Sequence, residues 1–249
     1  MAAEHGAIDH VAVVEREGRA LGAAARTRPD AEVPATPGWD VTKLVRHLAF
    51  VHARATAGLR SDDQESFFRR DDSLPSPVND RILETYDAGL DELLATLRDG
   101  RPSDRPVWTM DPDNPTASFW ARRMANETQI HRVDVEQAVG GALTPIPAEE
   151  AVDGIDELLT SFVVPRHAGK GVGTGETVHL HATDADGEWL LTLGADGVAL
   201  ERGHAKGDLA VRGPAAALDL WLWGRGPIDD LEVFGDAALA ARLRELTAV

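Results

Sequence analysis

The sequence contains no cysteine among its 249 residues. Without cysteine the chain can form no disulfide bond, no thiolate ligand for a metal and no thiol nucleophile of its own. Any thiol chemistry would therefore need a thiol supplied from outside the chain. Any metal would have to be bound through nitrogen and oxygen atoms.

Positive charge is also scarce, with 25 lysine and arginine residues against 42 aspartate and glutamate residues, a formal net charge of -17. Proteins that bind nucleic acids neutralise phosphates with a basic surface, and no basic cluster here is dense enough for that. The same charge balance disfavours anionic membranes. We therefore expect neither a nucleic-acid nor a membrane partner, and we interpret most of the negative charge as solubilising surface.

Long hydrophobic runs are absent, although hydrophobic residues make up 43% of the sequence. No run approaches the roughly 20 apolar residues that span a bilayer. Residues 1–10 have neither the basic nor the apolar region of a signal peptide. The sequence thus predicts a cytoplasmic protein whose core is large enough for one large domain or two ordinary ones.

Apolar residues recur at helical spacing in the first part of the chain. Helices are expected over residues 8–26, from residue 40 onward, over 78–97 and over 118–139. Asp40 follows a Pro-Gly-Trp turn and is a suitable N-cap for the second of these helices. The polar stretch 61–77 is interpreted as a long loop. This pattern predicts a four-helix bundle.

The pattern changes after residue 140. One more helix is expected over residues 147–164, followed by a glycine-rich connector at 165–175. Period-two alternation then predicts strands at 178–181, 189–193, 198–201 and 209–212. Two further helices are expected at 215–223 and 237–246. We therefore predict an α+β protein, with a helical domain over residues 1–145 and a small α/β domain over 146–249.

The strongest candidate for a metal site lies in the fourth expected helix. Glu127 and His131 are four residues apart, so a helix would bring their side chains to within about 40° of each other. A carboxylate oxygen and an imidazole nitrogen at one point suit zinc or another divalent metal. Asp134 could accept a hydrogen bond from the ring nitrogen of His131 that binds no metal. An ordinary solvent-exposed Glu–His pair has the same spacing.

A third ligand could come from the second expected helix, which carries His47 and His52. Their side chains would point about 140° apart, so both cannot face one interior point. His47 lies in an apolar stripe and could equally be a histidine of the core. The general geometry of helical bundles does not choose between the two.

Several stretches resemble the mycothiol-dependent maleylpyruvate isomerase family, part of the wider group of DinB-like metal-binding four-helix bundles. Residues 39–48 share its Trp and His-Leu positions, and residues 127–134 share its Glu-x-x-x-His-Arg-x-Asp pattern. Residues 207–214, 220–225 and 233–236 resemble the family's second domain, a small α/β unit similar to sterol-carrier folds. The resemblance spans nearly the whole chain.

This resemblance implies that His47, Glu127 and His131 are the metal ligands and that His52 is not. It further implies an isomerase or S-transferase that uses mycothiol, a low-molecular-weight thiol of actinobacteria, as a cosubstrate against a small electrophile. Zinc is the favoured metal, although a ligand set of one oxygen and two nitrogens accepts several divalent ions. Three protein ligands leave a coordination position open for the thiol.

Arg225 is the candidate residue for binding the organic part of a substrate. It follows an apolar helix and a glycine, and its guanidinium could hold a carboxylate of the substrate or of the thiol bidentately. A surface ion pair is the alternative interpretation of this residue.

Two other functions fit the same sequence. In a metal-dependent hydrolase the open position would activate water in place of a thiol. A non-catalytic binding or regulatory protein would retain the same bundle and use its second domain to hold an apolar ligand. His179 and His181 alternate on an expected strand and face the same side, so they could bind a metal, but a solvent-exposed strand is the more common explanation.

Overall fold

The computed structural model describes residues 8–61, 81–99, 106–111 and 114–248. The chain divides into two compact units, Met1–Thr144 and Pro145–Val249. The first is helical and the second combines helices with a sheet, which confirms the predicted α+β class. Among the described helices, none is both long enough and apolar enough to cross a membrane.

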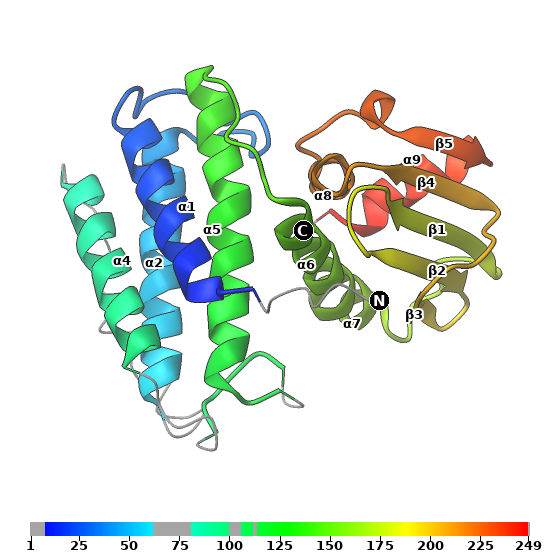
Figure 1. The fold of residues 1–249 in the computed structure, drawn as a ribbon, viewed down its shortest axis with the longest axis horizontal. Coiled ribbons are helices and arrows are strands. Elements are labelled where there is room, and N and C mark those ends of the chain that lie inside the picture. The colour runs from blue at the N-terminus through cyan, green and yellow to red at the C-terminus, as the bar shows by residue number, and fades with distance from the viewer. Residues whose placement is uncertain (1–7, 62–80, 100–105, 112–113, 249) are drawn as a thin grey trace. The chain divides into compact units, whose positions relative to one another are not determined.

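The described part of the first unit forms a bundle of four helices (Figure 1). Within it α1 packs against α5, and α2 packs against α4. The predicted helices agree with the observed ones to within a few residues. The expected start of the third helix and nearly all of the expected loop at 61–77 lie outside the described residues. The four helices are α1 (His10–Ala25), α2 (Val41–Arg60), α4 (Ile82–Arg98) and α5 (Ala117–Val139).

Local sequence signals explain where these helices begin and end. Asp40 is the N-cap of α2, as predicted, and its side chain accepts a hydrogen bond of 2.7 Å from the backbone N–H of Lys43. The Thr116 hydroxyl caps α5 in the same way. Gly140 ends α5 with a φ of 78°, a left-handed conformation that glycine adopts at little cost.

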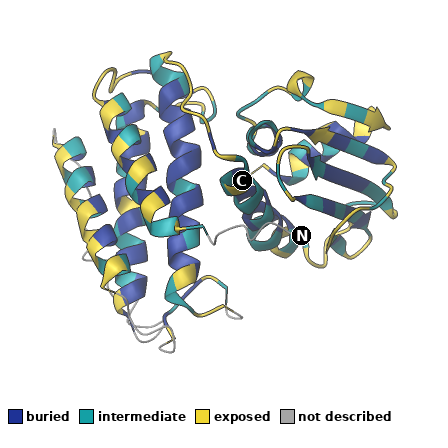
Figure 2. Cartoon of the chain, in the orientation of Figure 1, coloured by how far each residue is buried: buried dark blue, intermediate teal, exposed yellow. Residues whose placement is uncertain are grey.

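Apolar side chains from all four helices fill the interior of the bundle, while exposed residues lie mainly on the outer faces of α1, α2 and α4 (Figure 2). Leu21, Leu44 and Leu90 are completely buried. Helix α5 is buried over most of its length and also carries buried polar residues. The bundle therefore has an apolar core that does not depend on its polar groups.

Arg132 on α5 is the largest completely buried charged side chain among the described residues of this unit. It is fully buried, and its Nε and Nη1 atoms each donate a hydrogen bond of 2.7 Å, to Glu17 on α1 and to Glu136 on α5. Nη1 also donates to the carbonyl of Thr144 at 2.8 Å. Arg132 thus links α1, α5 and the segment that follows α5.

The second unit begins with α6 (Ala148–Glu157), which continues into the π-helical segment η2 (Leu158–Val163) and the short helix α7 (Val164–His167). The predicted end of this helix at residue 164 was three residues too early. Pro165 lies near the junction of the π-helical segment with α7, and the backbone stays helical through it to His167. The proline therefore does not terminate the helix.

A five-stranded sheet follows, in the order β3-β2-β1-β4-β5. Strands β1 and β4 are parallel, and the other neighbours are antiparallel. The strand β5 was not predicted, because it has only four residues and no alternation of buried and exposed positions. The strands are β1 (Glu176–Ala182), β2 (Glu188–Gly194), β3 (Gly197–Arg202), β4 (Leu209–Gly213) and β5 (Glu232–Gly235).

Helices α8 (Ala215–Trp223) and α9 (Ala237–Leu246) contact the sheet, and a short 3₁₀ turn, Ile228–Asp230, precedes β5. Val178 and Leu180 on β1 are buried on the same face as Leu191 on β2. Because side chains alternate along a strand, His179 and His181 lie on the opposite face. The two faces of the sheet therefore differ in chemistry.

Candidate metal centre

The structure brings together the three candidate ligands that the family resemblance implied, His47, Glu127 and His131. The Oε1 atom of Glu127 lies 3.1 Å from Nε2 of His47 and 3.4 Å from Nε2 of His131. One donor atom from each of the three side chains lies within 4.8 Å of the other two. A tetrahedral ion with bonds of about 2.0–2.1 Å holds its ligand atoms roughly 3.3 Å apart. The three donor atoms therefore fit a divalent metal.

Asp134 orients the imidazole of His131. Its Oδ2 atom lies 2.8 Å from Nδ1 of His131, and its side chain is fully buried. The carboxylate accepts the Nδ1 proton, so Nε2 is the ring nitrogen that faces Glu127 and His47. The three-residue spacing in the sequence predicted this contact.

Arg123 is a residue of the centre that the sequence analysis did not identify. Its guanidinium bonds to Oε2 of Glu127, and its side chain is almost completely buried. Because this bond occupies Oε2, the other carboxylate oxygen, Oε1, is the one that faces the histidines. Arg123 lies four residues before Glu127, the spacing at which helical side chains meet, so a signal was present.

Electrostatics keep Glu127 ionised. Burial opposes its ionisation, but Arg123 and the two histidines outweigh burial and hold the pKa of its carboxyl well below the usual range. Burial also lowers the pKa of His131, yet the carboxylates of Glu127 and Asp134 raise it to about 9. The cluster thus places an ionised carboxylate between two imidazoles. A divalent cation would compete with the proton of His131 for this position.

His52 lies apart from the centre although it shares α2 with His47. It is fully buried, and its Nε2 atom lies 3.0 Å from the hydroxyl of Thr128. Burial lowers the pKa of His52 to about 4, so the ring is neutral at pH 7. Within the described residues, His52 is not part of the group whose atoms could share one ion. The structure therefore favours His47 over His52 as the third candidate ligand, in agreement with the family resemblance.

Solvent can reach the centre from the side of His47, whose side chain is 33% exposed, compared with 14% for Glu127 and 11% for His131. Trp39 packs edge-on against His47, with ring centroids 5.5 Å apart. Lys43 in turn lies 4.9 Å from the centroid of the Trp39 ring. An ion held by three protein atoms at such a site would have a further position for an incoming small molecule.

Arg225 belongs to the second unit, directly after the left-handed Gly224 that ends α8. Its Nη1 atom donates to the carbonyl of Trp223 at 2.6 Å, and its guanidinium lies 5.9 Å from the centroid of that indole ring. Of the two tryptophans of α8, Trp221 is buried, whereas Trp223 is partly exposed and contacts Phe162. The three candidate ligands thus belong to the first unit, whereas Arg225 belongs to the second.

A buried carboxyl group, that of Asp219, interacts electrostatically with Arg225. Asp219 on α8 is almost completely buried. Burial and the nearby Glu157 raise the pKa of Asp219 to about 8, although Trp223 and Arg225 act in the opposite direction. At pH 7 this carboxyl group is therefore mostly protonated.

Comparison with known proteins identifies the family. Residues 11–136, just over half of the chain, match the model of the "Mycothiol maleylpyruvate isomerase N-terminal domain". The chain belongs to this family. Residues 149–242 match the "MDMPI C-terminal domain", so both units of the chain carry a family domain. The resemblance seen in the sequence is confirmed.

Solved structures show the same fold. The structure of a mycothiol-dependent maleylpyruvate isomerase is similar to this chain with a TM-score of 0.61 and 16% sequence identity, over 90% of this chain and 91% of the other. A structure of a single-residue mutant of that enzyme gives the same values. No curated protein matches this chain in sequence. At this identity the two structures show the fold alone.

Proposed function

We propose that this protein is a metal-dependent enzyme that activates mycothiol for addition to, or transfer onto, a small electrophile, as in the isomerisation of maleylpyruvate. The observation that carries the proposal is the convergence of His47, Glu127 and His131 within a member of this family. The absence of cysteine means that the chain supplies no thiol itself. The thiol would therefore be a cosubstrate.

A metal at this centre would bind the thiol sulfur and lower its pKa, which makes a thiolate available near neutral pH. The residues of the chain prepare the position for that ion. Asp134 holds the proton of His131 on Nδ1, and Arg123 holds Oε2 of Glu127. Both contacts direct one donor atom of each ligand towards the same point, which reduces the reorganisation needed on binding.

We further propose that Arg225 binds a carboxylate of the electrophile or of the thiol. A guanidinium recognises a carboxylate bidentately and with a fixed geometry, which a lysine does not do. Gly224, with its φ of 75°, turns the chain after α8 and directs it into Arg225. Arg225 would thus contribute binding and orientation of the organic groups, separate from binding of the ion.

The test supplies zinc-loaded protein with maleylpyruvate in three conditions, with mycothiol, with free cysteine and without a thiol. We expect turnover to need a thiol and to be fastest with mycothiol, since contacts to its sugars would position the sulfur. Glu127→Gln should lose both metal and turnover. Asp91→Asn, which changes an exposed ion pair with Arg19, serves as the control.

Turnover of maleylpyruvate, or of a hydrolysable ester, without any thiol would contradict the proposal. Hydrolysis of the ester without any thiol would identify the protein as a metal-dependent hydrolase in which bound water is the nucleophile. Protein that takes up no metal when zinc is supplied would instead favour a non-catalytic binding function.

A further inference from the structure

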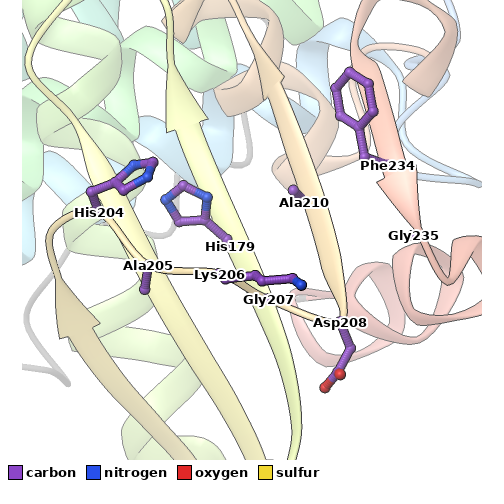
Figure 3. Close-up of a pocket in the computed structure, with 9 residues that line it drawn as sticks. All are labelled: His179, His204, Ala205, Lys206, Gly207, Asp208, Ala210, Phe234 and Gly235. Atoms are coloured by element: carbon purple, nitrogen blue, oxygen red, sulfur yellow. The ribbon is translucent and has the colours of Figure 1, made fainter.

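A second group of metal-binding side chains lies on the sheet of the second unit. His179 on β1, Glu188 at the start of β2 and His204 just after β3 meet on one face. The Oε2 atom of Glu188 lies 2.9 Å from Nε2 of His179 and 2.8 Å from Nδ1 of His204. One donor atom from each residue lies within 4.8 Å of the others. The two imidazole rings are nearly perpendicular, with centroids 5.4 Å apart (Figure 3).

Strand register explains why these residues meet. The antiparallel pairing of β1 and β2 places His181 opposite Glu188, so His179 is a diagonal neighbour of Glu188 on the same face. The sequence suggested the pair of His179 and His181. In the structure Nε2 of His181 lies 3.9 Å from Oε1 of Glu188, outside the trio. The second histidine of the group is His204, whose contact with Glu188 cannot be read from the alternation of residues along a strand.

The loop that carries His204 is held to the sheet at both ends. The N–H of Gly203 donates to the carbonyl of Glu188 at 3.0 Å. The N–H and hydroxyl of Thr177 each donate to Oδ2 of Asp208 at 2.8 Å. A Cβ atom at Gly207 would lie only 2.9 Å from the backbone nitrogen of His179, so glycine allows the loop to approach β1. The backbone of the loop is therefore held against the sheet, which places His204 beside Glu188 and His179.

Burial separates the roles of the two histidines. His179 is 5% exposed, whereas the side chain of His204 is 80% exposed. A buried imidazole with a carboxylate beside it gives a fixed pair of donors, and an exposed one can adjust. The contacts of 2.8 and 2.9 Å are shorter than the roughly 3.3 Å between ligand atoms around tetrahedral zinc. The exposed side chain of His204 and the partly exposed side chain of Glu188 can each move by the few tenths of an ångström that these two contacts require.

We propose that His179, Glu188 and His204 bind a divalent transition-metal ion of the zinc class, at a site separate from the candidate centre in the first unit. Two imidazole nitrogens and one carboxylate oxygen are a donor set that suits zinc, cobalt or nickel rather than calcium or magnesium. The ion takes the place of the two hydrogen bonds to Oε2 of Glu188.

The site opens into a pocket of about 540 Å³. His179 and His204 line one end of it, and Lys206, Ala210 and Phe234 contribute other parts of the wall (Figure 3). An ion held by three protein atoms has at least one position left for water or a small ligand.

The proposal is tested on the full-length protein, stripped of metal and titrated with Zn²⁺ against a chromophoric chelator. We expect His204→Asn and Glu188→Gln each to weaken one site by at least about tenfold and to lower the bound zinc by one ion per chain. The same loss is expected when His47→Ala is also present. His181→Asn, on the same strand and face, is the matched control and should retain the ion.

Unchanged zinc stoichiometry and affinity in His204→Asn would overturn the proposal. Because that side chain is mostly exposed, its replacement should leave the fold intact, which near-ultraviolet circular dichroism can verify. Loss of the ion in His181→Asn to the same degree would also overturn this choice of ligands. Failure of His47→Ala to remove an ion would count against the proposed function alone, so the two proposals can be distinguished.

Discussion

Each of the three candidate metal ligands in the first unit has a partner that fixes its direction. Asp134 contacts His131, Arg123 contacts Glu127, and Trp39 packs against His47. Such supporting contacts orient ligands before the ion arrives and usually change metal affinity 10- to 100-fold when removed, in order of magnitude. The centre is therefore organised by residues outside the ligand set as much as by the ligands.

The two histidines of α2 should separate metal binding from stability. We expect His47→Ala to remove most of the zinc and change stability little, since its side chain is one-third exposed. His52→Ala should retain the zinc but lower stability by about 2 kcal/mol, because it leaves a cavity in the core. Elemental analysis and urea unfolding measure the two effects. Loss of zinc in His52→Ala, with zinc retained in His47→Ala, would reverse the assignment.

Asp219 should make the second unit less stable as the pH rises. Its folded pKa of about 8 lies above the usual value of 3.8 for an aspartate, so between these values the folded state keeps a proton that the unfolded state loses. Stability is then full below pH 3.8 and declines until about pH 8, by at most about 1.4 kcal/mol per pH unit.

Replacing Asp219 with Asn should remove this decline, so the variant should gain stability over the native protein as the pH rises from 4 to 8. Hydrogen exchange of the α8 amides at pH 5 and pH 8 reports the stability of this unit directly. Equal pH dependence in the two proteins would mean that Asp219 is ionised in the folded state.

The sequence revealed residues of the candidate sites only where the relevant contacts are local or belong to a known motif. Glu127, His131 and Asp134 lie within two turns of one helix, so their proximity follows from helical geometry. Arg123 has the same kind of spacing and could have been identified. His204 is different, because it meets Glu188 through a loop that returns to the sheet. No spacing rule in the sequence predicts such a contact.

At the scale of helices and strands, periodicity predicted most elements because most of them bury one face. It failed where that condition does not hold. Strand β5 (Glu232–Gly235) is mostly exposed at the edge of the sheet, and the segment after α6 changes to π-helical geometry without a change in sequence pattern. The parallel pairing of β1 with β4 also depends on contacts between distant segments, which periodicity does not report.

The contact between α1 and α5 should depend on Arg132. We expect Arg132→Met to destabilise the first unit by about 3–5 kcal/mol, because it leaves Glu136 as a buried charge without its cation and leaves buried Glu17 with only the half-exposed Arg16. Arg19→Met removes another arginine–carboxylate pair between helices, but an exposed one, and should cost less than about 1 kcal/mol. Chemical unfolding followed by circular dichroism compares the two. Similar losses in both variants would show that burial of the Arg132 network has no special cost.

For the molecule as a whole, removal of metal should not unfold the bundle. Its apolar core includes residues from all four described helices, unlike a zinc finger, whose folding depends on its ion. Chelation should lower the melting temperature by a few degrees at most, the effect of lost binding linkage, and leave the helical circular dichroism unchanged. Complete loss of helical signal on chelation would show that the ion is structural.

The match of two family domains to the two units raises the question of whether both take part in one reaction. Arg225 tests this, since it lies in a different unit from His47, Glu127 and His131. If its guanidinium binds a carboxylate of the electrophile or the thiol, Arg225→Ala should reduce turnover about 100-fold, the order of magnitude for loss of a positioning contact. Zinc content should not change.

Two further variants sharpen that experiment. Arg225→Lys keeps the positive charge but loses the planar, bidentate geometry, so it should recover only part of the turnover. Arg212→Ala changes another arginine of the same unit, which pairs with Glu232 on the sheet, and should behave like the native protein. The melting temperature of each variant separates a loss of substrate binding from a loss of folding, since Arg225 also bonds to the carbonyl of Trp223. Normal thiol-dependent turnover in folded, zinc-loaded Arg225→Ala would remove this residue from the reaction and leave the first unit as the source of the proposed activity.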